Sequence, residues 1–454
     1  MLDYIAVIGG GLAGCEAALQ IAKRGIKVKL YEMKPIQFSG AHSNENLAEI
    51  VCSNSFKSNL LTNACGLLKE ELRILGSELI PVADKVKVPA GQALAVDRND
   101  FALEVTKKVE ENPNIEVIRQ EINTIPEEGI VIIATGPLTS EKFAKNILQK
   151  IGENDLYFYD AAAPIVEKDS INMEIAFYGN RYEEERVLEE DYNTWLERIQ
   201  NQEKSYINLP MNKEEYERFV EELIKAETVV LHDFEKREIF EGCMPLEIMA
   251  KRGNDTLRFG PLKPVGFTDK RTGRRPYAVV QLRQDNEEGT LYNLVGFQTN
   301  LKYGEQKRVF SMIPGLENAD FVKYGVMHRN TYIDSTKLLD NTYSLKADSR
   351  IYFAGQITGV EGYVESISSG FVAGINASNQ FKKKEKIVFD IKTVIGSLAE
   401  YISTPKENFQ PMNANFGILP ELNQKIRDKK ERYQKLAERS LEIIHKKKGG
   451  SDGN

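Results

Sequence analysis

The chain has 454 residues, of which 41% are apolar and 28% charged, and 60 Lys and Arg residues stand against 67 Asp and Glu. This length predicts two or three domains, and four widely spaced cysteines exclude a small disulfide-stabilised secreted module. No apolar run reaches the about 18 to 20 residues of a membrane helix, and a strand begins as early as Tyr4, so we expect a cytoplasmic protein without signal peptide or membrane partner.

The first predicted elements form a βαβ unit. Tyr4–Ile8 is an apolar strand, an Ala-rich helix covers Leu12–Lys23, and a second strand covers Lys27–Tyr31. Two later apolar segments, Ile130–Ala134 and Ile351–Ala354, have the composition of central strands of a parallel sheet. The predicted fold class is therefore α/β, with a Rossmann-like FAD-binding domain of the glutathione reductase type and an inserted α+β domain.

Changes in composition predict the domain boundaries. Residues 1–165 form the first part of the FAD-binding domain, and residues 301–445 form its second part with a C-terminal helix. The insertion covers residues 166–300 and is predicted to face RNA, for the reasons given below. Residues 446–454 are rich in Lys and Gly and are predicted to be a disordered tail.

The turn after the first strand carries a dinucleotide-binding motif. It satisfies GxGxxG with Gly9, Gly10, Gly11, Leu12, Ala13 and Gly14, and Glu32 follows at the end of the second strand. The glycines permit a tight turn, close approach to a pyrophosphate and close helix packing, while the acid can accept hydrogen bonds from a ribose. This unit alone fits NAD, S-adenosylmethionine or FAD.

Two further strand ends favour FAD. Thr135 and Gly136 follow one apolar strand, and Gly355 and Gln356 follow another, at the positions where flavoproteins of the glutathione reductase type bring their backbone close to the cofactor. The sequence has no second GxGxxG motif. A nicotinamide reductant, NADH or NADPH, is therefore expected to dock only transiently.

The four cysteines differ in their surroundings. Cys15 and Cys65 are predicted to be core residues, whereas Cys52 lies in a polar loop where packing and chemistry are equally plausible. Cys243 lies in a Gly-Cys-Met-Pro segment shortly before a basic stretch. The four histidines are scattered, so no metal site is predicted.

The stretch from Lys251 to Arg283 is strongly basic. It contains nine Lys or Arg residues against Asp255 and Asp269, a local charge of +7 in an acidic chain. Positive potential favours both a thiolate and a bound polyanion. Because this stretch follows the Cys243 loop, it predicts contact with RNA.

Seven motifs make the chain similar to the TrmFO family of folate- and FAD-dependent tRNA (uracil-5-)-methyltransferases, flavoproteins related to MnmG. They are Val7–Gly14, Glu49–Ser55, Leu61–Glu71, Glu241–Pro245, Arg258–Gly266, Arg271–Pro276 and Gly355–Tyr363. The resemblance implies methylation of uridine C5 in RNA, with 5,10-methylenetetrahydrofolate as carbon donor and reduced FAD as methylene carrier and hydride source. The T-loop uridine of tRNA, U54, is the expected target.

The resemblance also implies residue roles. Cys243 would add to C6 of the uracil ring, which makes C5 nucleophilic, and Cys52 would remove the C5 proton. Tyr363 would lie against the flavin, and Arg271, Arg274 and Arg275 would hold RNA phosphates. The alternatives are the same chemistry on a uridine of 23S ribosomal RNA, or a small-molecule flavin oxidoreductase.

Overall fold

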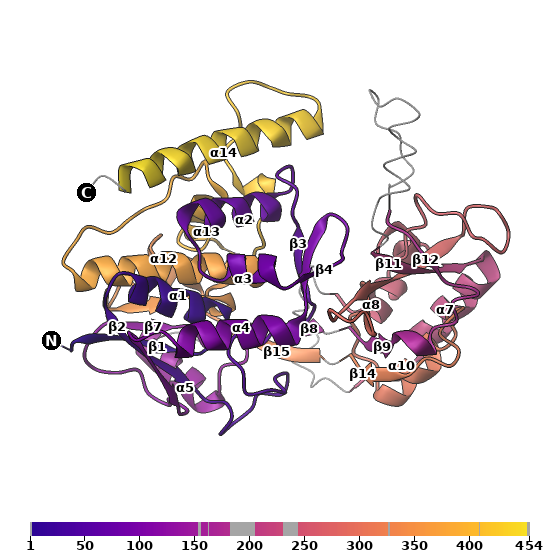
Figure 1. Cartoon of the computed structure of the whole chain (residues 1–454), viewed down its shortest axis with the longest axis horizontal. Coiled ribbons are helices and arrows are strands. Elements are labelled where there is room, and N and C mark those ends of the chain that lie inside the picture. The colour runs from indigo at the N-terminus through magenta and orange to yellow at the C-terminus, as the bar shows by residue number, and fades with distance from the viewer. Residues whose placement is uncertain are drawn as a thin grey trace.

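The computed structural model describes residues 2–152, 156–161, 163–181, 205–229, 244–325, 327–407 and 409–451. They form two lobes, each built around its own large sheet (Figure 1). Both ends of the chain lie on the first lobe. Two antiparallel strands, β8 (Leu156–Ala161) and β15 (Met327–Tyr332), connect the lobes.

A five-stranded parallel sheet forms the centre of the first lobe. Its order is β16 (Ile351–Phe353), β7 (Val131–Ile133), β1 (Tyr4–Ile8), β2 (Lys27–Glu32) and β6 (Ile115–Arg119). The central strands are apolar and buried because helices cover both faces of a parallel sheet. Figure 1 shows α1 (Leu12–Lys23) and α12 (Tyr363–Phe381) above the sheet and α5 (Glu141–Ile151) below it. The predicted α/β fold class is thus confirmed.

Small residues allow α1 and α12 to pack closely. A Cβ atom added to Gly370 would lie 2.2 Å from the carbonyl oxygen of Ala13, and one added to Gly374 would lie 2.9 Å from Cα of Ala17. These contacts are backbone contacts, so a larger side chain would separate the helices. The close packing holds the start of α12 near the glycine turn that follows β1.

Further elements complete the first lobe. A small antiparallel sheet contains β3 (Ser55–Ser58), β5 (Ala93–Val96) and β4 (Lys87–Val88). The remaining helices are α2 (Ala64–Leu75), α3 (Ile80–Lys85), α4 (Arg98–Glu110), α11 (Ser335–Leu338), α13 (Val394–Tyr401) and α14 (Lys429–Ser451), with short 3-10 turns η4 (Gln356–Thr358) and η5 (Phe416–Ile418).

The second lobe is an antiparallel sheet with helices packed against it. The strand order is β10 (Phe177–Tyr178), β11 (Tyr206–Met211), β12 (Ala278–Gln284), β13 (Leu291–Leu294), β9 (Ile165–Glu167) and β14 (Phe321–Lys323). The helices among its described residues are α7 (Lys213–Lys225), α8 (Leu246–Lys251), α9 (Thr256–Phe259) and α10 (Tyr303–Phe310), with the 3-10 turn η1 (Lys168–Ser170).

The structure differs from two predicted boundaries. The second lobe extends beyond residue 300, because β14 pairs with β9 and closes the sheet at Lys323. Helix α14 continues to Ser451, where the sequence predicts disorder from residue 446. There Lys447 donates to the carbonyl of Val388 at 3.0 Å and lies over the ring of Phe389, contacts that hold the end of the helix against the first lobe. The charged segment 183–203 lies outside the described residues.

Candidate functional site

The turn between β1 and α1 sterically requires glycine at two of its positions. Gly9 has φ +104°, and a Cβ atom there would lie 2.5 Å from the carbonyl oxygen of Ala134. A Cβ on Gly14 would lie 1.8 Å from the carbonyl oxygen of Gly9. A Cβ on Gly11, in contrast, would meet no atom within 4 Å. Gly11 therefore leaves space beside the first turn of α1, where backbone N–H groups favour a phosphate.

The predicted ribose-binding acid lies beside this turn. Glu32 is 8% exposed, and its carboxylate accepts hydrogen bonds from the N–H groups of Gly10 at 2.8 Å and Lys34 at 2.9 Å. These bonds fix the carboxylate at the end of β2, at the edge of the sheet where ligands of such folds bind.

One cleft of about 1100 Å³, including its open mouth, runs along this edge. Eleven of the twelve predicted cofactor-binding residues line it, namely Gly9, Gly10, Gly11, Leu12, Ala13, Glu32, Thr135, Gly136, Gly355, Gln356 and Tyr363. The twelfth, Gly14, packs against the turn itself. The cleft therefore gathers the predicted cofactor-binding residues from four strand ends and the start of α12 in one place.

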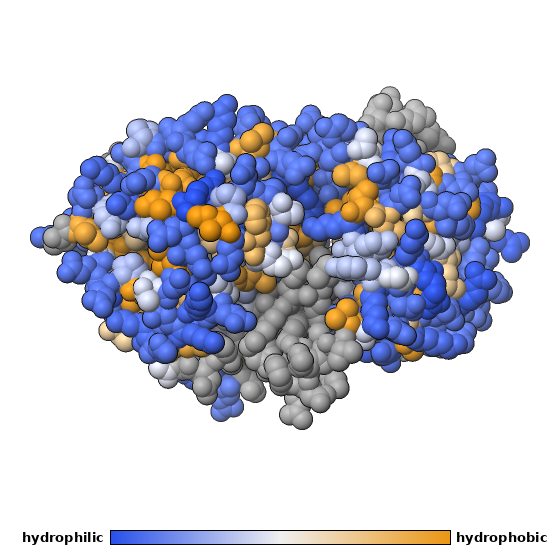
Figure 2. Space-filling view, turned by 90° about the horizontal axis from the view of Figure 1, so that it is seen from below, coloured by the Kyte–Doolittle hydropathy of each residue, from blue (hydrophilic) through white to orange (hydrophobic). Residues whose placement is uncertain are grey.

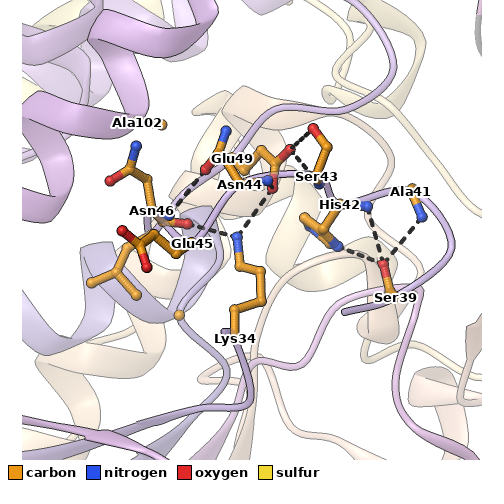
Figure 3. A network of polar contacts seen from close by, with 12 residues as sticks. Lys34, Ser39, Ala41, His42, Ser43, Asn44, Glu45, Asn46, Glu49 and Ala102 are labelled. Carbon is orange, nitrogen blue, oxygen red and sulfur yellow. Dashed lines mark hydrogen bonds and ion pairs between the residues drawn. The ribbon is translucent and has the colours of Figure 1, made fainter. Parts of the chain in front are cut away.

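The cleft has a further wall that the sequence analysis missed. It is formed by the loop after β2, where Lys34 and Glu49 make an ion pair at 3.2 Å with side chains only 4% and 8% exposed (Figure 3). Lys34 also donates to the carbonyl of Asn46 at 2.6 Å, and Glu49 accepts from the N–H and hydroxyl of Ser43. Burial alone would raise the pKa of Glu49, but these hydrogen bonds and Lys34 hold the pKa below its ordinary value. The opposite charges of Lys34 and Glu49 in this wall thus neutralise each other.

His42 lies on the same loop and lines the cleft. Its Nδ1 is 2.6 Å from the hydroxyl of Ser39 (Figure 3). Burial, together with the charge of Lys34, lowers the pKa of His42 and favours the neutral imidazole at neutral pH. In the sequence His42 is an isolated His in a polar segment, and no pattern there indicated that it lines the cleft.

Tyr363 joins the cleft to the loop that carries Cys52. Its hydroxyl oxygen accepts hydrogen bonds from the N–H groups of Cys52 at 3.0 Å and Ser53 at 3.1 Å. Burial raises the pKa of Tyr363, and a charge on Cys52 would raise it further, so Tyr363 stays protonated at neutral pH. The Cys52 thiol is half-buried. Two predicted site residues that are distant in sequence therefore lie side by side.

Side chains from both lobes hold the Cys52 loop. Arg98 donates to the carboxylate of Asp285 at 3.0 Å and to the carbonyl oxygens of Ile50 and Val51 at 3.3 Å. Arg283 donates to the side-chain oxygens of Asn54 at 2.9 Å and Ser53 at 2.7 Å. Because Asp285 and Arg283 belong to the second lobe, the position of the loop depends on how the lobes meet.

Strand β14 brings Lys323 to this junction. Burial, assisted by the charge of Arg98, lowers the pKa of Lys323, while Asp285, Glu49 and Cys52 oppose the change. The ammonium group is therefore within electrostatic reach of the Cys52 loop. No sequence motif pointed to Arg98, Asp285 or Lys323.

The other cysteines fall into two groups. Cys15 and Cys65 are buried, as predicted, and burial raises the pKa of both thiols, that of Cys65 to about 11. Cys243 lies outside the described residues, so its nucleophile role stays a prediction. The described chain resumes at Met244, which is buried just before α8.

The predicted RNA-binding arginines have different surroundings. Arg271 donates to Asp269 at 2.9 Å, to Glu215 at 3.3 Å and to the carbonyl of Pro210 at 2.9 Å, so its charge is already neutralised. Arg274 and Arg275 are exposed and make no ion pair with a described residue. A phosphate role is therefore better suited to Arg274 and Arg275 than to Arg271.

Figure 2 shows a mostly hydrophilic face with separate apolar patches over both lobes.

Two further sequence predictions concern absences. Within the described part of the chain, no helix is long and apolar enough to cross a membrane. Over those same residues, no three His, Cys, Asp or Glu side chains gather into a metal-binding group.

Comparisons with known proteins agree with this architecture. The family model described as "Glucose inhibited division protein A" matches residues 4–385. A protein of Acetivibrio thermocellus, named methylenetetrahydrofolate–tRNA-(uracil-5-)-methyltransferase TrmFO, is 60% identical over 445 residues and covers 98% of each chain. A protein of the same name from Listeria monocytogenes is 57% identical over 98% of each chain.

The fold also matches a solved structure. Aquifex aeolicus GidA superimposes with a TM-score of 0.67 over 97% of this chain and 73% of that chain, at 17% identity, which supports the fold alone. The sequence matches carry the family assignment and confirm the predicted resemblance. The chain therefore belongs to the glucose inhibited division protein A family and, within it, to the TrmFO methyltransferases.

Proposed function

We propose that this protein methylates C5 of a uridine in RNA, with FAD as cofactor, 5,10-methylenetetrahydrofolate as carbon donor and NADH or NADPH as reductant. The T-loop uridine of tRNA, U54, is the proposed target. The observation that carries the proposal is the hydrogen bonding of Tyr363 to the Cys52 loop at the edge of the nucleotide cleft. The names of the relatives support the folate donor and the tRNA acceptor.

The residues of the cleft fit FAD. Gly11 leaves open space beside the start of α1, which suits a pyrophosphate, and the fixed carboxylate of Glu32 suits a ribose. Gly355 keeps φ +83° at the end of β16, and its N–H donates to the hydroxyl of Ser369 at 2.6 Å. This arrangement supports placing the flavin end of the cofactor toward Gly355, Gln356 and Tyr363. When bound, reduced FAD would supply the methylene carrier and the hydride.

The protein's own side chains would perform the covalent and proton-transfer steps. The sulfur of Cys243 adds to C6 of uracil, and the electron pair of the C5–C6 double bond moves to make C5 nucleophilic. After C5 has gained the carbon, Cys52 takes the C5 proton, and the electron pair left on C5 forms a double bond to that carbon. When the carbon has received the hydride that the cofactor would supply, the C5–C6 double bond re-forms and the sulfur of Cys243 leaves C6. Hydrogen bonds from the Cys52 and Ser53 amides to Tyr363 fix the loop that carries this base.

A fluorinated substrate tests these roles. Replacement of the target uridine by 5-fluorouridine removes the C5 proton, so the sulfur–C6 bond cannot be released after carbon transfer. We expect such a tRNA, given folate donor and reductant, to form a covalent complex with the wild-type protein and with Cys52→Ala, but not with Cys243→Ala. Attachment through another residue, or no complex, would contradict the proposal. A ribosomal RNA fragment with the same substitution tests the alternative acceptor.

A further inference from the structure

An aromatic ring of the basic stretch Lys251–Arg283 is exposed on the second lobe. Phe259, the last residue of α9, is 74% exposed, the highest value among large apolar side chains of the described residues. Its neighbours on the chain, Leu257 and Leu262, are completely buried. The exposure therefore belongs to one side chain and does not reflect a loosely packed segment.

Backbone hydrogen bonds hold the turn that carries this ring. The N–H of Phe259 donates to Asp255 at 3.2 Å, and the N–H groups of Gly260 and Leu262 donate to Leu257 at 3.1 and 2.8 Å. The N–H of Val279 in β12 donates to Leu262 at 3.0 Å, which ties the turn to the sheet. Because the backbone of the turn is already fixed, only the two side-chain torsions of the ring are ordered when a flat partner stacks on it.

One arginine, Arg258, lies beside the ring and makes an ion pair with Asp255 at 3.2 Å. The guanidinium carbon of Arg258 lies 3.9 Å from the ring centroid of Tyr277 and 5.5 Å from that of Phe259. Arg258 Nε also donates to the carbonyl of Tyr277 at 3.3 Å, which places α9 beside the segment that follows Arg274 and Arg275. Phe259 therefore lies on an element that contacts the segment directly after the two exposed arginines.

We propose that Phe259 stacks on an unpaired base of the RNA substrate while Arg274 and Arg275 contact its phosphates. The inference rests on the proposed function. Aromatic rings within positive surfaces are the usual platform for single-stranded nucleic acid, because every base presents a π face. A protein partner would instead need a wider apolar patch than one ring.

Fluorescence and affinity together test the proposal. The probes are T-stem-loop RNAs that each carry 2-aminopurine at one unpaired loop position, where emission falls on stacking. The variants are Phe259→Leu, Phe259→Trp and, as matched control, Tyr303→Leu, which removes another exposed ring of the same lobe. We expect Phe259→Leu to weaken binding by about 5- to 100-fold without changing the salt dependence, and to abolish the quenching. Phe259→Trp and Tyr303→Leu should behave like the wild type.

The outcomes separate this inference from the proposed function. Unchanged affinity and quenching in Phe259→Leu, with labelled methyl transfer intact, would overturn the stacking role alone. A change in sedimentation mass without a change in RNA affinity would also overturn it, because the ring would then serve a protein contact. A wild-type protein that neither binds nor methylates RNA would overturn the proposed function itself.

Discussion

The nucleotide cleft of the first lobe and the basic surface of the second are determined by different features of the sequence. The cleft depends on backbone conformations, such as φ +104° at Gly9 and the open space at Gly11, which are set by adjacent residues. The basic surface depends on which charges are neutralised by partners, such as Arg271 by Glu215, 56 residues away. Local patterns therefore identify the cleft, whereas a local count of charges overstates the surface.

The largest expected effect lies where the two lobes meet, at Cys52. Cys52→Ala should lower the rate of uridine methylation by about 10²- to 10⁴-fold, because the variant lacks the base for the C5 proton. Cys65→Ala is the matched control, since that thiol is buried and accordingly keeps its proton. Single-turnover rates and melting temperatures measure both. Equal losses of activity in the two variants would assign Cys52 to packing.

The wall of the cleft contains a long-range charge pair of its own. Lys34→Met should reduce the free energy of unfolding by about 3 kcal/mol, because Glu49 is left buried without its cation. The double variant with Glu49→Gln should recover part of the loss. Urea unfolding measures all three proteins. An unchanged free energy of unfolding in Lys34→Met would show that this ion pair behaves like the solvated charges of the basic surface and not like a buried pair.

Two glycines separate folding from cofactor binding within the cleft. Gly14→Ala should reduce the free energy of unfolding by about 1 to 3 kcal/mol, because its Cβ collides with the carbonyl of Gly9. Gly11→Ala should leave stability nearly unchanged yet lower the flavin content of the purified protein. Gly40→Ala, which also meets no atom within 4 Å, should change neither. A fully flavinated Gly11→Ala protein would show that the cofactor lies elsewhere.

The smallest effects are expected on the basic surface. Arg274→Ala with Arg275→Ala should weaken RNA binding and reduce the slope of log affinity against log salt by about 1 to 2, without loss of stability. Arg271→Gln should instead reduce stability by about 1 to 2 kcal/mol and leave the slope unchanged, because its hydrogen bonds to Asp269 and Glu215 are lost. The reverse pattern would restore Arg271 as a phosphate ligand.

Features that adjacent residues determine could be predicted from the sequence, whereas features that depend on distant residues could not. The parallel strands and eleven of the residues that line the cleft were predicted, since apolar runs that end in glycine specify both strand and turn. The pairs Lys34–Glu49 and Arg98–Asp285 were both missed. The second pair joins residues 187 apart and depends on the docking of the lobes, which no local pattern indicates. The pairing of β14 with β9 was missed because a three-residue strand carries little periodicity.

Donor and acceptor can be tested together in one measurement. The protein is incubated with NADH or NADPH, carbon-labelled 5,10-methylenetetrahydrofolate and tRNA, and the RNA is then digested to nucleosides. The account predicts label in 5-methyluridine, lost when Cys52 is replaced by Ala and absent when the label is supplied as S-adenosylmethionine. Label from S-adenosylmethionine, or none in 5-methyluridine with any RNA, would contradict it.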